Sequence, residues 1–557
     1  MKAGFEKISR HKPWMQWCML FVLASLLSFF HLRMDMAAWS IGCVKSMKLV
    51  HLLQFSLAMT HTVLSILGLL LLVVRSRVMA YVVFPVVMFL WVVPTFLRMT
   101  MGFNLYSELI FGALGTNMHE LSGQLTFVRI AAFVIFVLVT YAMAWGCRTY
   151  FPRLQKLPAI WVWSASLLYI GGTTAIVPYL SQHKPEVLIP FVLEPLHGTD
   201  AERKFQLETA LVHMENEYKP EYPNRVLLPF YRQVAFAYYV YDYYRVPDIK
   251  KSEELPSTRW CSDDVVVVLF VGESYRANRS SWNGYHRETC PQLSREKSNI
   301  VNFPYFKSYA TSTASSIFGI LSDASCRNRK ATHTSFISIL KKHGFEPKML
   351  LCRTTEWQRN PQIHHVLDKK VPFVALCADT AEVVAHVEQI SAKTGSQFIL
   401  LEDGTGHAPY DHELQFARFG NSRDSDKYDN CLLQTDDLLY RIIQTLKDKK
   451  AVMLYSSDHG QSFGEQGAWM HGGALSVVQQ RHVFSFLWYS DSYALAHPEM
   501  IEAVKKNAGK LLSHDDIYTT VLSLSGIECS VPNLENNDFT KVLNRPEVTE
   551  FVLDEDK

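Results

Sequence analysis

The sequence predicts two unlike parts, an N-terminal bundle of five transmembrane helices and a C-terminal α/β domain. Hydrophobic residues make up 48% of the 557 residues; they crowd into the stretch before residue 180, and the charged residues gather after it. In the second part, short β-branched runs alternate with helical patterns, as α/β sheets require. The 55 Lys+Arg and 53 Asp+Glu residues nearly cancel, which excludes a polyanion-binding tail and gives no reason to expect a nucleic-acid partner.

Five stretches of the first part are long and apolar enough to cross a bilayer, which takes about 20 residues. They cover residues 14–32, 49–74, 79–97, 128–146 and 157–180. No clean small-residue cleavage site follows the first stretch, so we expect it to be retained rather than removed as a signal peptide. Residues 1–182 are therefore predicted to be the transmembrane domain.

Lysine and arginine residues flank these spans unevenly. Four of them precede the first span, and further ones join spans two to three and four to five, whereas the opposite side carries acids as well. Because short cytoplasmic flanks are enriched in Lys and Arg, the N-terminus is predicted to be cytoplasmic. With five spans, everything after residue 180 lies outside the cytoplasm, as does the loop of residues 101–127.

Residues 183–260 are predicted to be a linker that joins the membrane part to a domain of residues 261–557. An aromatic cluster between Tyr231 and Tyr244 suits the water–lipid interface. An interfacial helix and ordinary packing between linker and domain explain this cluster equally well.

Three apolar runs in the C-terminal part are predicted to be buried parallel strands. Residues 265–271 lead to Glu273, residues 397–401 lead to Glu402, and residues 451–455 lead to Asp458 and His459. Ligands in open α/β sheets bind outside the carboxyl ends of the strands. These three strand ends therefore predict a single site.

The residue types at the strand ends indicate a divalent metal held by oxygen and imidazole. Glu273, Asp458 and His459 would be three ligands, and a nucleophile or substrate would take the fourth position. Taken singly, such acids are more often helix caps, ion pairs or turn residues, but their joint placement favours a site. His407 and His471 follow two of the strand ends and are expected to share it.

Several motifs, in order along the chain, resemble those of the membrane phosphoethanolamine transferases, including the lipid A and colistin-resistance types. The similarity is strongest over residues 265–488, and five spans before a periplasmic domain are also the family's architecture. The motifs are Gly272-Glu273-Ser274-Tyr275-Arg276, Asn283-Gly284-Tyr285-His286-Arg287, Thr289-Cys290-Pro291-Gln292-Leu293, Thr311-Ser312-Thr313-Ala314, His407-Ala408-Pro409-Tyr410, Tyr428-Asp429-Asn430, Thr435-Asp436, Ser457-Asp458-His459-Gly460-Gln461-Ser462 and His471-Gly472.

The resemblance implies a fold similar to alkaline phosphatase and the sulfatases, with a zinc-bound threonine nucleophile. By its place in the motif that threonine is Thr313, with Thr311 as the close competitor. Glu273, Asp458 and His459 correspond to ligands of the tight zinc, together with the nucleophile. His407 and His471 correspond to residues that bind a second, looser zinc or the substrate phosphate.

The implied reaction is transfer of phosphoethanolamine from phosphatidylethanolamine to an envelope acceptor. A metal lowers the pKa of a hydroxyl, so Thr313 would attack the donor phosphorus and form a phosphoethanolamine-threonine intermediate. The expected place is the inner membrane of a Gram-negative cell, with the catalytic domain of a monomer in the periplasm. The favoured acceptor is a lipid A phosphate or the adjoining lipopolysaccharide core, at its sugar Kdo or heptose; periplasmic glucans and protein threonines are the other candidates. Capping a lipid A phosphate would bring polymyxin resistance by removing negative charge.

Two departures from the family stand out. In the external loop, Glu120 corresponds to an acid that contacts the donor headgroup, but the family's asparagine eight residues earlier is Gly112 here. The two cysteines that bracket the nucleophile loop in the best-known relatives are Tyr309 and Gly319. The exported part has seven cysteines, so at least one thiol is left over, and their pairing cannot be read from sequence.

Two other functions fit parts of the pattern. A phosphoglycerol transferase of the lipoteichoic-acid type also joins five spans to a threonine-nucleophile domain, but His407 and the motif of residues 458–462 favour phosphoethanolamine. A non-catalytic homologue that senses envelope lipids would be expected to have lost a ligand, and none is lost here. A formylglycine sulfatase needs Cys or Ser before x-Pro-x-Arg, which the sequence around Cys290 and Cys326 lacks.

Overall fold

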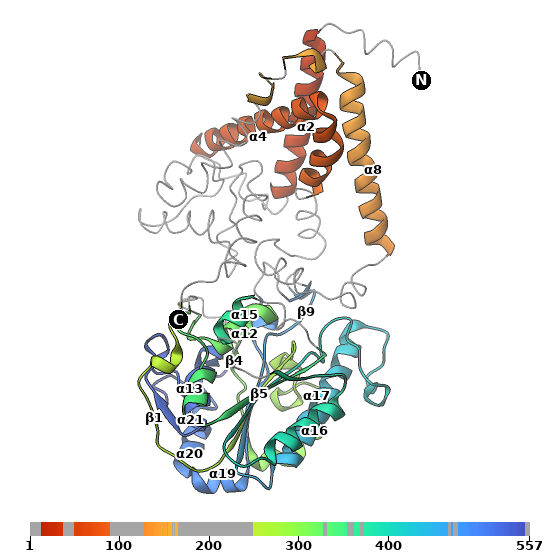
Figure 1. The fold of residues 1–557 in the computed structure, drawn as a ribbon. Coiled ribbons are helices and arrows are strands. Elements are labelled where there is room, and N and C mark those ends of the chain that lie inside the picture. Colours follow the sequence, from red (N-terminus) through yellow and green to blue (C-terminus); the bar gives the residue numbers. More distant parts are fainter. Residues whose placement is uncertain are drawn as a thin grey trace. The chain divides into compact units, whose positions relative to one another are not determined.

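The computed structural model of the chain describes residues 13–36, 49–89, 127–152, 154–158, 160, 162–164, 249–326, 331–353, 361–367, 373–465, 469–471 and 477–551. They belong to two compact units, one before and one after the linker (Figure 1). Outside the described residues lie most of the fifth predicted span, the aromatic cluster of the linker, and the external loop with Glu120.

Apolar helices form the first unit. They are α2 (Pro13–Met36), α4 (Leu49–Arg75), a π-helical turn η1 (Met79–Val83), α8 (Phe127–Tyr150) and a short 3-10 turn η2 (Leu154–Lys156). Buried side chains of these helices, among them Leu20, Leu70 and Ala144, form one apolar cluster. Arg148 in the last turn of α8 donates to the carbonyls of Val73 and Val74 at 3.3 and 3.0 Å, and so satisfies two otherwise unpaired carbonyls near the end of α4.

Among the described residues, one helical segment is both long and apolar enough to cross a membrane, Phe133–Tyr150. Shorter apolar helices cover Trp14–Ser28, Val63–Arg75 and Met79–Phe89. Four of the five predicted spans therefore coincide with apolar helices, but the five-span bundle itself is not confirmed.

A seven-stranded sheet is the centre of the second unit, with strand order β3-β11-β8-β2-β7-β5-β6. Strands β8, β2, β7, β5 and β6 run parallel, and β11 is antiparallel to both β8 and β3. Their bounds are β2 (Val266–Gly272), β3 (Ile300–Asn302), β5 (Glu346–Cys352), β6 (Phe373–Cys377), β7 (Gln397–Asp403), β8 (Ala451–Ser457) and β11 (Ser485–Tyr489). The three predicted strands are confirmed, and they are the three central ones.

Helices cover both faces of this sheet, as the all-apolar sequence of β2 requires (Figure 1). Alternate residues of β2 point to opposite sides: Val267 and Leu269 join one core, and Val268 and Phe270 join the other. Side chains of α16 (Thr380–Ser391) and α17 (Asp424–Leu446) complete the second core. The first core includes residues of α12 (Thr313–Leu321), α13 (Ile337–Lys342), α15 (Pro361–Leu367), α20 (Pro498–Asn507) and α21 (Ile517–Leu524).

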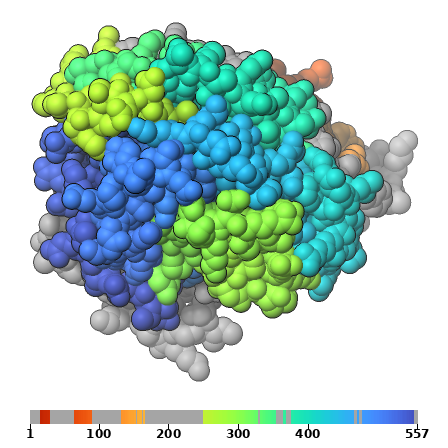
Figure 2. All heavy atoms as spheres, turned by 90° about the horizontal axis from the view of Figure 1, so that it is seen from below, coloured from red at the N-terminus to blue at the C-terminus, as the bar shows by residue number. Residues whose placement is uncertain are grey.

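Short elements close the remaining edges of the second unit. Their bounds are β1 (Ser257–Arg259), β4 (Phe306–Lys307), β9 (Ser462–Phe463), β10 (Trp469–Met470), β12 (Leu512–Ser513), β13 (Ile527–Cys529), α18 (Val478–Arg481) and α19 (Asp491–Ala496). Residues 257–259, which the sequence assigned to the linker, pair with β13 inside this unit. Segments distant in sequence also meet on its surface, as the adjoining green and blue segments in Figure 2 show. One such contact is a hydrogen bond in which Asn299 Nδ2 donates to Asp491 Oδ1 at 2.6 Å.

The register of the sheet brings the central strand ends together. Gly272, the last residue of β2, lies opposite Asp403 at the end of β7 and Ser457 at the end of β8. The residues that follow these three positions therefore leave the sheet at one level of its carboxyl edge, where the sequence placed the site.

Candidate active site

Glu273 and Asp458 follow β2 and β8, and main-chain hydrogen bonds tie these two strand ends to each other. The N–H of Asp458 donates to the carbonyl of Gly272 at 2.8 Å. The N–H groups of Ser274 and His459 donate to Asp458 Oδ1 at 2.9 and 2.7 Å. Asp458 Oδ2 is buried and has no hydrogen-bond partner among the described residues. Since an unpaired buried carboxylate oxygen is costly, this atom calls for a positive partner.

Glu273, Asp458 and His459 form a fully buried cluster, here called the inner triad. One ligand atom from each lies within 4.8 Å of the others. His459 Nε2 is 3.6 Å from Glu273 Oε1 and 3.1 Å from Asp458 Oδ2. Two carboxylates and an imidazole are a donor set that zinc prefers, and together with the unpaired Asp458 oxygen they fit a divalent ion.

Thr313 brings a hydroxyl to the inner triad. Its Oγ1 lies 3.3 Å from Glu273 Oε2 and 3.1 Å from His459 Nε2. Thr313 is also the first residue of α12, whose N-terminal N–H groups favour negative charge nearby. Of the two threonines that the motif leaves open, Thr313 is therefore the one whose hydroxyl contacts two of the expected metal ligands.

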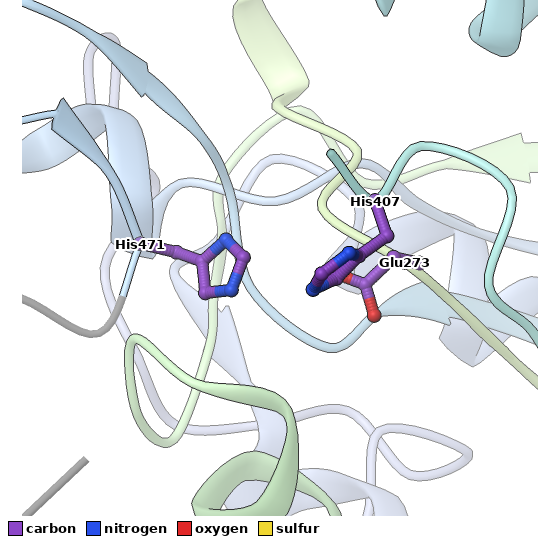
Figure 3. Close-up of side chains that lie close together, drawn as sticks. All are labelled: Glu273, His407 and His471. Atoms are coloured by element: carbon purple, nitrogen blue, oxygen red, sulfur yellow. The ribbon is translucent and has the colours of Figure 1, made fainter. Parts of the chain in front are cut away.

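Glu273 also belongs to a second cluster, the outer triad of Glu273, His407 and His471, in which one ligand atom from each again lies within 4.8 Å of the others. Figure 3 shows His407 beside Glu273, with His471 reaching toward them from another segment. The chain passes close to Glu273 at Gly406, where a Cβ would lie 2.6 Å from the Glu273 carbonyl oxygen and φ is 115°. Only glycine meets both conditions, so Gly406 lets the loop after β7 place His407.

The three imidazoles of the site share one orientation. Each Nδ1 faces a carbonyl oxygen: His459 that of Gly460 at 2.9 Å, His407 that of Ala408 at 2.8 Å, and His471 the side-chain Oε1 of Gln461 at 2.7 Å. Because a carbonyl oxygen can only accept, each Nδ1 carries the hydrogen. Each Nε2 then offers a lone pair, which is what a metal ligand needs.

The electrostatics keep two of these imidazoles, those of His459 and His471, neutral. Burial lowers the pKa of His459, although the neighbouring Asp458 opposes the shift. Burial lowers the pKa of His471 well below its usual value, and His459 and His407 lower it further. Neutral imidazoles bind cations, so the shifts agree with the orientation of the rings.

The segment that carries Thr313 is fixed without a covalent link. The ring of Tyr309 packs directly on Gly319, where a Cβ would lie 2.2 Å from Tyr309 Cγ. The N–H of Tyr309 donates to Nδ1 of the buried His514 at 3.0 Å, and His514 Nε2 contacts the carbonyl oxygen of Ser457 at 3.0 Å. Beyond α12, the N–H of Cys326 donates to the carboxylate of Asp515, the residue that follows His514. The turn of residues 514–516 thus holds the nucleophile segment at both ends.

Other motif residues support the site rather than line it. Asp429 of α17 pairs with Arg279 at 3.0 Å and Arg287 at 2.7 Å, and accepts from the hydroxyl of Tyr285 at 2.7 Å. Asp436 accepts from the N–H groups of Gln292 and Leu293. These contacts tie residues 279–293 to α17.

Sequence reasoning missed three residues that orient the site: Gln461, Tyr410 and His514. The first two stand inside quoted motifs, but nothing in those motifs says which side chain they orient. His514 carries no local signal. None of the seven cysteines between Cys261 and Cys529 forms a disulfide in the structure.

Comparison with known proteins places this site in a family. Residues 266–527 match the sulfatase family. They form a sulfatase-family domain. This domain contains the inner triad, the outer triad and Thr313.

Curated relatives of the chain are named as phosphoethanolamine transferases. Phosphoethanolamine transferase EptA of Escherichia coli K12 is 29% identical over 299 residues, which cover 47% of this chain and 53% of the relative. Phosphatidylethanolamine transferase Mcr-1 of Escherichia coli is 30% identical over 305 residues, which cover 46% and 53%. The chain thus spans about half the length of the curated relatives it matches.

One solved structure extends the similarity of fold to nearly the whole chain. The integral membrane protein lipooligosaccharide phosphoethanolamine transferase A from Neisseria meningitidis is 18% identical, with a TM-score of 0.65 over 94% of this chain and 98% of that one. The fold similarity therefore includes the apolar helices of the first unit.

Proposed function

We propose that this chain transfers phosphoethanolamine from phosphatidylethanolamine to an envelope acceptor, lipid A or the lipopolysaccharide core, with Thr313 as the nucleophile. The observation that carries the proposal is the contact of Thr313 Oγ1 with Glu273 and His459 at the N-terminus of α12. The name of EptA supports the phosphoethanolamine group, and a further relative, Kdo(2)-lipid A phosphoethanolamine 7''-transferase of Escherichia coli K12, 24% identical over 317 residues, supports an envelope acceptor.

Zinc fits the inner triad, and Thr313 would complete its ligand set. When bound there, the ion supplies Lewis-acid chemistry, lowering the pKa of a hydroxyl and offsetting charge on phosphate oxygens. The lone pairs of His407 and His471 favour a second, weaker cation in the outer triad over direct donation to the substrate phosphate.

The chain's own residues account for both steps of the transfer. Thr313 Oγ1 attacks the donor phosphorus, its bond to phosphorus forms, and the bond to the glycerol oxygen breaks. The threonine proton ends on the diacylglycerol that leaves. The acceptor oxygen then attacks the same phosphorus, the bond to Thr313 breaks, and Thr313 regains a proton. The N–H groups at the start of α12 stabilise the phosphate oxygens in both steps.

The donor is a membrane lipid, which gives the apolar unit its role. We propose that residues 1–182 cross the inner membrane of a Gram-negative cell five times and leave the catalytic domain of a monomer in the periplasm. Glu120, outside the described residues, is proposed to contact the donor headgroup.

Mass spectrometry of lipid A and core oligosaccharide tests the proposal in cells with and without the gene. We expect a phosphoethanolamine-sized mass gain with the wild type. Thr313→Ala should lower the amount of modified product about 10³-fold or more, whereas the matched control Thr311→Ala should leave that amount unchanged. A phosphoglycerol-sized gain would identify the rival transferase. No change in envelope phosphoethanolamine with Thr313→Ala would support a non-catalytic role.

A further inference from the structure

Among the three imidazoles of the site, His471 is held differently from the others. The Nδ1–H groups of His459 and His407 donate to main-chain carbonyls of the very next residue. The Nδ1–H of His471 donates to a side chain instead, Oε1 of Gln461. A main-chain carbonyl remains an acceptor whatever side chain its residue carries, whereas substitution of Gln461 removes the acceptor of His471.

Gln461 is itself fixed from the other side. Its Nε2 donates to the hydroxyl of Tyr410 at 2.5 Å, and both Gln461 and Tyr410 are buried. Tyr410 closes the loop after β7 that carries His407, since its N–H donates to the His407 carbonyl at 2.8 Å. The relay from Tyr410 through Gln461 therefore connects the loops of both outer histidines.

The direction of the amide decides what His471 can bind. An amide oxygen accepts the Nδ1 hydrogen, so Nε2 keeps its lone pair and suits a cation. An amide nitrogen in that place would donate to Nδ1 and move the ring hydrogen to Nε2, which would then suit an anion. In the structure the amide oxygen faces His471 Nδ1 and the amide nitrogen faces the Tyr410 hydroxyl, which is the first arrangement.

We propose that Gln461 is a positioning residue that holds the Nε2 lone pair of His471 on the outer triad and so makes this cluster a cation site. The inference rests on the proposed function for its biological meaning. Its test is zinc binding, which needs neither donor nor acceptor.

The measurement is zinc titration of the purified full-length chain in detergent, with a chromophoric chelator as competitor. Gln461→Leu removes the acceptor, and we expect the weaker zinc to bind about 10- to 100-fold less tightly while the inner ion stays bound. His471→Ala should cause at least this loss, and the double variant should lose nothing beyond His471→Ala, because without the imidazole Gln461 has no ring to orient.

Two further variants separate positioning from general damage. Gln461→Glu can only accept from His471 and can still accept from Tyr410, so it should restore zinc binding to within a few-fold of the wild type. Gln480→Leu is the matched control: Gln480 is also buried and donates to the carbonyl of Met470 at 3.1 Å, beside His471, but does not set the ring. It should leave zinc binding nearly unchanged.

Several results would overturn the inference. They are unchanged zinc binding in Gln461→Leu, losses that add in the double variant, a Gln461→Glu variant as weak as Gln461→Leu, or an equal loss in Gln480→Leu. A chain that binds zinc as expected but transfers no phosphoethanolamine would refute the proposed function and leave this inference standing. In an active chain, Gln461→Leu should change KM for the donor more than kcat.

Discussion

The inner and outer triads share Glu273 but are built in different ways. The other inner residues, Asp458 and His459, are buried and directly follow a central strand, and the N–H groups of Ser274 and His459 hold the Asp458 carboxylate. The outer histidines are half-buried, stand on loops, and depend in one case on the side chain of Gln461. A metal site set by strand ends is preorganised by the fold, whereas one set by loops is adjustable. We therefore expect any ion in the inner triad to be held more tightly than one in the outer triad.

The largest expected effect comes from breaking the inner triad alone. Asp458→Asn removes a buried charge, and we expect the tight zinc to bind at least about 100-fold more weakly. His471→Ala should weaken only the outer ion, and Glu273→Gln should weaken both because it is shared. The zinc content of the purified full-length variants after dialysis checks this order. Equal losses of zinc in Asp458→Asn and His471→Ala would contradict the difference between a tight inner site and a weaker outer site.

A smaller effect is expected where the nucleophile segment joins the inner triad. Gly319→Ala pushes a methyl group against the Tyr309 ring, and we expect about 1–3 kcal/mol of destabilisation together with slower transfer. The matched control Gly509→Ala meets nothing closer than 3.8 Å and should be silent. Thermal unfolding and transfer rates provide the comparison. If adding Tyr309→Ala to Gly319→Ala does not reduce the destabilisation, then contact with the Tyr309 ring is not its cause.

The smallest effect concerns acid. Burial lowers the pKa of His514 from 6.5 to about 3 in the folded chain. As the pH falls below 6.5, His514 binds a proton in the unfolded chain but stays neutral in the folded chain, so the free energy of unfolding decreases. We expect this residue to contribute about 1–2 kcal/mol of loss between pH 7 and pH 5. His514→Gln, which does not titrate, should flatten the pH dependence of the unfolding midpoint; an unchanged slope would count against the buried neutral ring.

The parts of the site that could be read from sequence are those fixed by local patterns. The β-branched runs predicted the three central strands, and strand ends placed Glu273, Asp458 and His459 at one edge. Contacts between distant segments have no such pattern. The pairing of Gln461 with His471 across a hairpin, and of His514 with Tyr309 across 205 residues, depends on tertiary packing alone.

In the best-known relatives of the family, cysteines stand at the positions of Tyr309 and Gly319. The structure shows how these two residues contact each other in this chain. Packing of the Tyr309 ring and hydrogen bonds at both ends of the segment hold the nucleophile segment in place without a covalent bridge. That substitution could not be predicted, because a tyrosine and a glycine ten residues apart carry no signal of contact.

The cysteines of the second unit have a consequence for how it matures. No disulfide joins any of the seven cysteines between Cys261 and Cys529 in the structure, so the placement of Thr313 requires no oxidant and no thiol exchange. The domain reaches its working geometry through packing alone. The geometry around Thr313 is therefore independent of the redox state of its surroundings.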